Sequence, residues 1–181
     1  ILGATSGNVT AIVTADTAAA LNTALTNATT GTDALTLTIN DTTLTSVSDL
    51  LALDGKTNVA VNASSVNSIS ETIANLNTAY NSAGISGLGN ENISITNTGT
   101  ITAAQINDLL GETSGTITLV GSGNLAITMT SGQTLDLSGI TNSLSGNLSI
   151  TDSTGNETIT GTSANDTLTL SSGNDTVNLG N

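Results

Sequence analysis

The chain has 181 residues, a formal net charge of −13 and one basic residue, Lys56. Because contacts with phosphates depend on Lys and Arg, this charge excludes a nucleic-acid-binding function and argues equally against adsorption to anionic membranes. The absence of His and Cys excludes Ser-His and Cys-His catalytic pairs, zinc sites built from those residues, and disulfide bonds.

The apolar residues are nearly all small aliphatics, since aromatic residues make up 1% of the chain and Phe and Trp are absent. Such residues suit a thin core of many similar layers better than the interior of a compact globule. They recur at strand and helix periods, so we expect an ordered chain rather than a disordered one. No apolar run approaches the length of a membrane span, and we expect no membrane insertion.

Helix signals recur four times in the first two thirds of the chain. Capping residues, aliphatic stripes at helical spacing and glycine stops mark them. In chain order, they predict a helix over residues 17–27 capped by Asp16, one over residues 45–53 that ends at Gly55, one that follows a capping box at residues 68–71 and contains Tyr80, and one that follows a capping box at residues 102–105 and ends at Gly111.

Aliphatic residues alternate with polar ones between the predicted helices, which predicts strands with one buried face. The alternating sets are Leu35, Leu37 and Ile39; Val59 and Val61; Ile93 and Ile95; Ile117 and Leu119; and Leu125, Ile127 and Met129. Residues 8–120 therefore predict single strands alternating with helices, whereas the chain from about residue 124 onward predicts short strands and turns only. Parallel strands need a crossover connection, which the helices supply.

A hexamer of the form Gly-x-x-x-aliphatic-x recurs along the chain. Early copies, 24 or 34 residues apart, begin at Gly31, Gly55, Gly89 and Gly123. Later copies, each nine residues after the one before, begin at Gly146, Gly155, Ala164 and Gly173. A constant period of nine over four copies is typical of a repeat architecture.

We therefore predict a mainly β fold, a parallel β-solenoid or β-roll with short helices inserted in its N-terminal coils. Residues 1–122 are expected to form the coils with helical insertions. Residues 123–181 are expected to form a compact β-solenoid that ends in the nonapeptide repeats of residues 146–181. The alternative is a separate small α/β domain with a boundary near residues 121–123.

The four nonapeptides resemble the RTX family of secreted bacterial proteins, whose repeats read Gly-Gly-x-Gly-x-Asp-x-aliphatic-x. The resemblance implies a parallel β-roll in which the aliphatic residue points inward and the acidic residue binds calcium between neighbouring turns. The acidic position falls on Glu157, Asp166 and Asp175, which are the expected calcium ligands. The alternative is that these side chains only close the turns through hydrogen bonds.

Two features depart from the pattern of the RTX repeat. Leu148 stands where the earliest nonapeptide would carry its acidic residue. The first two glycine positions of the repeat read Asp152-Ser153, Gly161-Thr162 and Leu170-Ser171, so only Gly161 keeps a glycine there. Because those glycines let backbone carbonyls approach the ion, we expect at most one or two calcium sites, centred on Asp166 and Asp175.

The remainder of the chain, rich in Thr, Asn and Ala, is similar in composition to the β-strand repeats of bacterial surface-layer proteins and giant adhesins. The resemblance implies a non-enzymatic structural element in an extracellular location, on the bacterial cell surface. Its expected partners are further coils of the same polypeptide, other copies of it, and cell-surface polysaccharide. The chain starts at Ile1 without Met and stops inside a repeat at Asn181, which predicts a piece of a longer polypeptide.

Two other functions remain as alternatives. One is a polysaccharide-binding or polysaccharide-active solenoid, for which the nearest carboxylate pairs in sequence are Asp49 with Asp54 and Asp108 with Glu112. We interpret these residues instead as parts of polar helix faces and helix ends. The other is ice binding by outward Thr-x-Thr ladders, although Thr is also a common residue on solvated strands.

Overall fold

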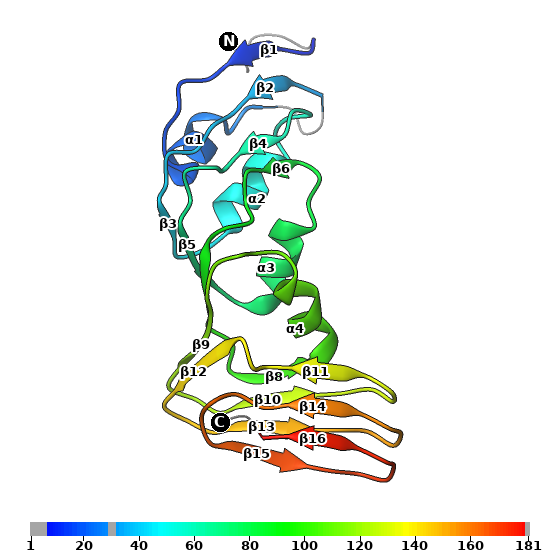
Figure 1. The fold of residues 1–181 in the computed structure, drawn as a ribbon. Helices are drawn as coiled ribbons and strands as arrows, with labels where there is room; N and C mark the ends of the chain where they lie inside the picture. The colour runs from blue at the N-terminus through cyan, green and yellow to red at the C-terminus, as the bar shows by residue number, and fades with distance from the viewer. Residues whose placement is uncertain (1–6, 29–31, 180–181) are drawn as a thin grey trace.

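The computed structural model describes residues 7–28 and 32–179 as an elongated molecule, with its first strand and its last two strands at opposite ends (Figure 1). The hexamer glycine Gly31 and the chain ends at residues 1–6 and 180–181 lie outside the described residues. Helices accompany the strands in the N-terminal part, and only strands and turns follow α4 (Figure 1). In the described part of the chain, every pairing between named strands is parallel.

The longest sheet contains five strands in the order β12-β9-β7-β5-β3. Their bounds are Thr43–Leu44 (β3), Ser68–Glu71 (β5), Asn92–Ile95 (β7), Ile117–Gly121 (β9) and Ile140–Leu144 (β12). Each strand comes from a separate coil, by which we mean one circuit of the chain between residues that stack in register. These coils are 23 to 25 residues long, as shown by the successive register partners Leu44, Ile69, Ile93, Ile117 and Ile140.

Two further sheets build the C-terminal part. One has the order β15-β13-β10-β8, with bounds Gly99–Thr102 (β8), Leu125–Thr128 (β10), Leu148–Thr151 (β13) and Asp166–Thr169 (β15). The other has the order β11-β14-β16, with bounds Thr134–Asp136 (β11), Thr158–Thr160 (β14) and Thr176–Asn178 (β16). The last coil is shorter, because Thr158 pairs with Thr176, 18 residues later. Two nonapeptides therefore make one coil, and the parallel sheets are consistent with a β-roll.

Short sheets at the N-terminal end complete the early coils. They pair β1 (Thr10–Ile12) with β2 (Ala34–Thr36) and β4 (Val61–Asn62) with β6 (Ile85–Ser86). The early coils thus carry two or three short strands each, not the single strand predicted. Stacking brings every side of a coil against the same side of its neighbour, so backbone groups outside the main sheet also find partners.

The interior consists of aliphatic columns that run along the stack. Ile101, Ile127 and Ile150 are register partners on neighbouring strands, and all three are buried. The buried apolar residues from Ala18 to Ile159 belong to one cluster. Beyond it the column continues with Leu168, which is only partly buried because β15 is the edge strand of its sheet.

Each of the four helices in the described residues connects, along the chain, a strand of one coil to a strand of the next. Their bounds are Ala18–Ala24 (α1), Ser48–Asp54 (α2), Ile73–Tyr80 (α3) and Ala103–Leu110 (α4). The predicted capping box at residues 102–105 is confirmed, since Thr102 and Gln105 bond each other's backbone N–H groups and Gly111 ends α4. Helix α1 begins one residue later than predicted, because Thr17 rather than Asp16 is its capping residue.

The capping box predicted at residues 68–71 was wrong. These residues form β5, and the side chain of Glu71 turns to the preceding coil, where it accepts a hydrogen bond from the N–H of Val47 at the start of α2. Asp41 accepts from the N–H of Ala18 in α1 in the same way, and Asn97 accepts from the N–H of Ile73 in α3. Helix N-termini have free N–H groups, and at α1, α2 and α3 the next coil supplies an acceptor for one of them.

Candidate metal centre

Two turns stack on one side of the C-terminal coils. The first, residues 152–157, joins β13 to β14, and the second, residues 170–175, joins β15 to β16. Asn174 N–H donates to Asn156 Oδ1 over 2.9 Å, and Glu157 N–H donates to Asp175 Oδ1 over 3.2 Å. The nonapeptide period therefore places equivalent residues of the two turns directly beside each other.

Three carboxylates meet between these turns. Asp152, Glu157 and Asp175 each contribute one oxygen to a group in which all oxygens lie within 4.8 Å of one another. Asp152 is 7% exposed and Glu157 is 1% exposed. The only basic residue of the chain, Lys56, lies several coils away in the turn after α2. Three ionised carboxylates at this spacing repel each other by at least about 3.5 kcal/mol per pair at an effective dielectric constant of about 20.

Hydrogen bonds satisfy only part of this cluster. Asp152 Oδ1 accepts from Ser171 N–H over 2.6 Å, and Glu157 Oε1 accepts from Gly132 N–H over 2.8 Å. The second oxygens, Asp152 Oδ2 and Glu157 Oε2, are buried and have no hydrogen-bond partner. A net contribution of about 1 kcal/mol per hydrogen bond does not offset the repulsion, so the cluster lacks a positive charge.

Another Gly-Asn-Glu turn in the same molecule shows how a buried glutamate is satisfied by protein alone. Glu91 occupies the hexamer position that Glu157 occupies, and it is fully buried. Its Oε2 accepts hydrogen bonds from the Tyr80 hydroxyl over 2.7 Å and from the N–H groups of Gly89 and Asn90 over 2.8 and 3.2 Å. Glu91 therefore needs no ion, whereas Glu157 keeps one oxygen free inside a group of acids.

The residues of the cluster fit calcium. Calcium takes carboxylate and carbonyl oxygens as ligands, and a divalent cation compensates charges that the protein leaves unpaired. The 170–175 turn also approaches the 152–157 turn closely, so that a Cβ atom at Gly173 would overlap the carbonyl oxygen of Gly155. A glycine at this position thus lets the two turns meet around the carboxylates.

Asp166 lies apart from this cluster. It begins β15, whereas Asp152 directly follows β13, the parallel neighbour of β15, so the two residues are at opposite ends of the same sheet. Its oxygens accept hydrogen bonds from the N–H of Thr162 over 2.7 Å and from the hydroxyl of Thr162 over 3.0 Å. Its register partner in the preceding coil is Leu148.

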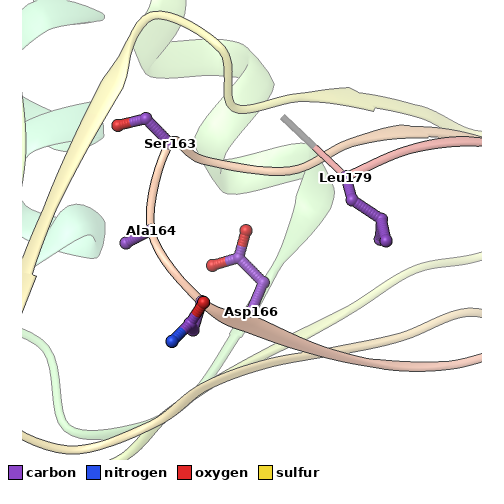
Figure 2. A pocket seen from close by; sticks show the side chains of 5 residues that line it. Ser163, Ala164, Asp166 and Leu179 are labelled. Atoms are coloured by element: carbon purple, nitrogen blue, oxygen red, sulfur yellow. The ribbon is translucent and has the colours of Figure 1, made fainter. Parts of the chain in front are cut away.

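Figure 2 shows the Asp166 carboxylate turned into the space between its own turn and Leu179. This space is an open pocket of about 410 Å³, lined by residues 163–166 and Leu179. The structure therefore brings two of the three expected ligands together, Glu157 and Asp175. Asp166 lies apart from them, in a turn closed by its hydrogen bonds with Thr162.

Sequence reasoning missed Asp152 as a member of the cluster. It stands where the repeat pattern has its first glycine, so the sequence predicts a lost backbone ligand there rather than an additional side-chain ligand. The available signal was a second acidic residue in the turn that already contains Glu157.

The carboxylates of Asp49 and Asp54 are directed to different coils. Asp49 accepts a hydrogen bond from Asn22 of the preceding coil, and Asp54 accepts one from Ser82 of the following coil.

Comparison with known proteins identifies the repeats around this cluster. Residues 151–181 match the family model of the RTX calcium-binding nonapeptide repeat, in four copies. RTX repeats bind calcium, are a structural and non-catalytic motif, and occur in secreted bacterial proteins. No curated protein and no solved structure matches the chain. No helix in the described residues is long and apolar enough to cross a membrane. The C-terminal part of the chain, residues 151–181, is therefore an RTX-type calcium-binding repeat region.

Proposed function

We propose that this chain is a structural element of an extracellular protein on the bacterial cell surface, built by stacking coils and stabilised at its C-terminal end by calcium. One observation carries the proposal: a group of three carboxylates, two of them buried with one oxygen each that has no hydrogen-bond partner, lies between two stacked turns of a parallel β stack. Side chains of Asp152, Glu157 and Asp175 would hold the ion, which neutralises their charge when bound. The high calcium concentration outside cells would then favour the folded C-terminal coils.

We also propose that the coils close into one solenoid, with residues 1–122 and 123–181 as its two segments. The buried apolar residues from Ala18 to Ile159 form one cluster, which supports one stack with two segments rather than two domains with independent cores. The pairing of β9 with β12 supports it as well, because these strands lie on either side of residue 122. Rigidity along the stack suits a stalk, a filament or a surface lattice.

Stacking leaves an edge at each end of the described chain. At one end β1 is an edge strand that exposes Ile12, and at the other β15 and β16 are edge strands beside the exposed Leu170 and Leu179. Open edges with apolar residues pair readily with another strand. The proposed partner is a further coil of the same kind, from the same polypeptide or from another copy.

The calcium part of the proposal is tested by thermal unfolding of the full chain, followed by circular dichroism in calcium and in chelator. We expect a higher Tm in calcium, because ligand binding to the folded state stabilises it. Identical melting curves in both solutions would contradict this part.

The structural role is tested by electron microscopy of the calcium-loaded protein at increasing concentration. We expect regular filaments or lattices to form by end-to-end stacking. Particles that stay separate, single and irregular at all concentrations would contradict the assembly part of the proposal and leave calcium binding standing.

A further inference from the structure

We infer that Asp152 is a third side-chain ligand of the calcium ion, and that the described chain holds a single complete site, on one side of the roll only. This inference rests on the calcium binding in the proposed function and assigns its ligands. In the RTX repeat pattern the position of Asp152 belongs to a glycine, which offers no side chain to an ion.

The backbone and one oxygen of Asp152 are already fixed in place. Its N–H donates to Thr169 O over 3.2 Å, and its Oδ1 accepts from Ser171 N–H over 2.6 Å. Both partners belong to the coil that follows. The remaining oxygen, Oδ2, is buried without a partner in a residue that is nine-tenths buried, within a group of carboxylates. A side chain held in this way loses little conformational entropy when it binds a cation.

The ligands also connect three successive coils. Glu157 Oε1 is held by Gly132 N–H in the turn between β10 and β11, Asp152 and Glu157 themselves lie in the next turn, and Asp175 lies in the one after. An ion held by these carboxylates would therefore join the coil that ends in β16 to the two coils before it. Aliphatic burial alone holds that coil weakly, since Val177 is 36% exposed.

The opposite side of the roll has no equivalent group among the described residues. Asp166 lies there in register with Leu148, and both of its carboxylate oxygens accept hydrogen bonds from Thr162. An acid at residue 148 would have supplied the neighbouring charge that Glu157 and Asp175 supply to each other. The sequence thus replaces an alternating pair of sites by one site with an additional carboxylate.

Isothermal titration of the calcium-free full chain tests the assignment. We expect one calcium ion per chain for the wild type. Asp152→Asn keeps an oxygen that accepts from Ser171 N–H but removes the charge, and is expected to weaken binding about tenfold or more, as the number of charged ligands sets calcium affinity. Asp152→Gly, the residue of the repeat pattern, is expected to weaken it at least as much.

Two matched variants separate ligation from the general loss of a negative charge. Asp166→Asn removes the same charge within the same repeats, and Asp108→Asn removes it from the exposed face of α4. Both are expected to change the affinity less than about twofold, because distant charges act only through screened electrostatics. Circular dichroism in saturating calcium checks that each variant folds.

The outcomes separate this inference from the function on which it rests. Unchanged affinity in Asp152→Asn, an equal loss in Asp166→Asn, or two or more ions per chain would overturn the inference while calcium binding stands. A wild-type chain that takes up no calcium would remove the calcium part of the proposed function itself.

Discussion

The hydroxyl of Tyr80, at the end of α3, donates a hydrogen bond of 2.7 Å to Oε2 of Glu91, in the turn before β7. Tyr80 is the only aromatic residue of the chain, and Glu91 is fully buried. Burial, the hydrogen bond to Glu91 and the charge of Glu91 all raise the pKa of Tyr80 well above its ordinary value of 10.0. The contact therefore fixes α3 to its coil only while the phenol keeps its proton.

Alkaline solution is expected to destabilise the protein through Tyr80. The folded state raises the pKa of the phenol, so its stabilising contribution is fully present below about pH 10 and decreases as the pH rises further toward the folded pKa. Tyr80→Phe is expected to lower the free energy of unfolding at neutral pH by about 1–3 kcal/mol and to remove this part of the alkaline decrease. Urea unfolding at several pH values measures both. Equal alkaline slopes in wild type and variant would contradict the assignment.

Glutamates in the two Gly-Asn-Glu turns are expected to respond oppositely to the same substitution. Without calcium, Glu157→Gln is expected to leave the Tm unchanged or raise it, because it removes repulsion from the carboxylate cluster, and to reduce the rise in Tm that calcium causes. Glu91→Gln is expected to lower stability by about 1–3 kcal/mol with or without calcium, since an amide nitrogen then faces N–H donors. Melting curves of both variants in calcium and chelator provide the measurement, and similar behaviour of the two would refute the distinction.

Acidic solution is expected to weaken the attachment of α2 to the next coil. Burial acts to raise the pKa of Glu71, but hydrogen bonds from Thr72, Ser46, Val47 and Asn75 outweigh it, and the pKa lies below its ordinary value of 4.5. The stabilising contribution is therefore present above about pH 4.5 and is lost as the pH falls through the folded pKa.

Glu71→Gln tests this acid dependence. The variant is expected to be less stable than the wild type at pH 7 and nearly equal to it at the lowest pH at which both fold. Hydrogen exchange of the Val47 amide follows the contact directly, because Glu71 Oε2 accepts from it. A difference in stability that stays constant across the acidic range would argue against the role of the Glu71 charge.

The close approach of the two metal-binding turns predicts the effect of Gly173→Ala. Its Cβ atom would overlap the carbonyl oxygen of Gly155, and Gly173 has a φ of 157°. We expect the variant to separate the 170–175 turn from the turn beneath it and to weaken calcium binding about tenfold or more, since ligands on both turns must meet. Gly139→Ala is the control, because nothing lies within 4 Å of a Cβ atom there. Calorimetric titration should show normal binding for the control alone.

Aliphatic columns predict a gradient of mutational cost along the stack. Ile127→Ala removes a fully buried side chain from the column and is expected to lower the free energy of unfolding by about 2–5 kcal/mol. Val177→Ala, at the exposed edge strand β16, is expected to change it by less than about 1 kcal/mol. Denaturant unfolding in calcium compares the two, and equal losses would show that another coil covers β16 in solution.

Part of the metal centre was predictable from the sequence. The period of nine and the acidic position in each copy point to Glu157 and Asp175, which do meet. Asp166 has the same place in its repeat but a leucine, Leu148, in register beside it. Asp152 belongs to the cluster although it stands at a position where the repeat pattern has glycine. Repeat position alone does not report whether the neighbouring coil offers a charge, an aliphatic side chain or a hydroxyl.

The sequence by itself determined the local features of this protein, because they depend on residues within one turn or one strand. These are the capping box of α4, the inward aliphatic face of the strands between the two ends of the stack, and the change to a nonapeptide period. Only the tertiary structure decided which coil supplies each partner. Glu71 caps a helix of the coil before it, and Asp152 meets Asp175 of the coil after it. The physical reason is that each coil places residues 18 to 26 positions apart side by side, so contacts between coils depend on the register of the stack, which no short segment encodes.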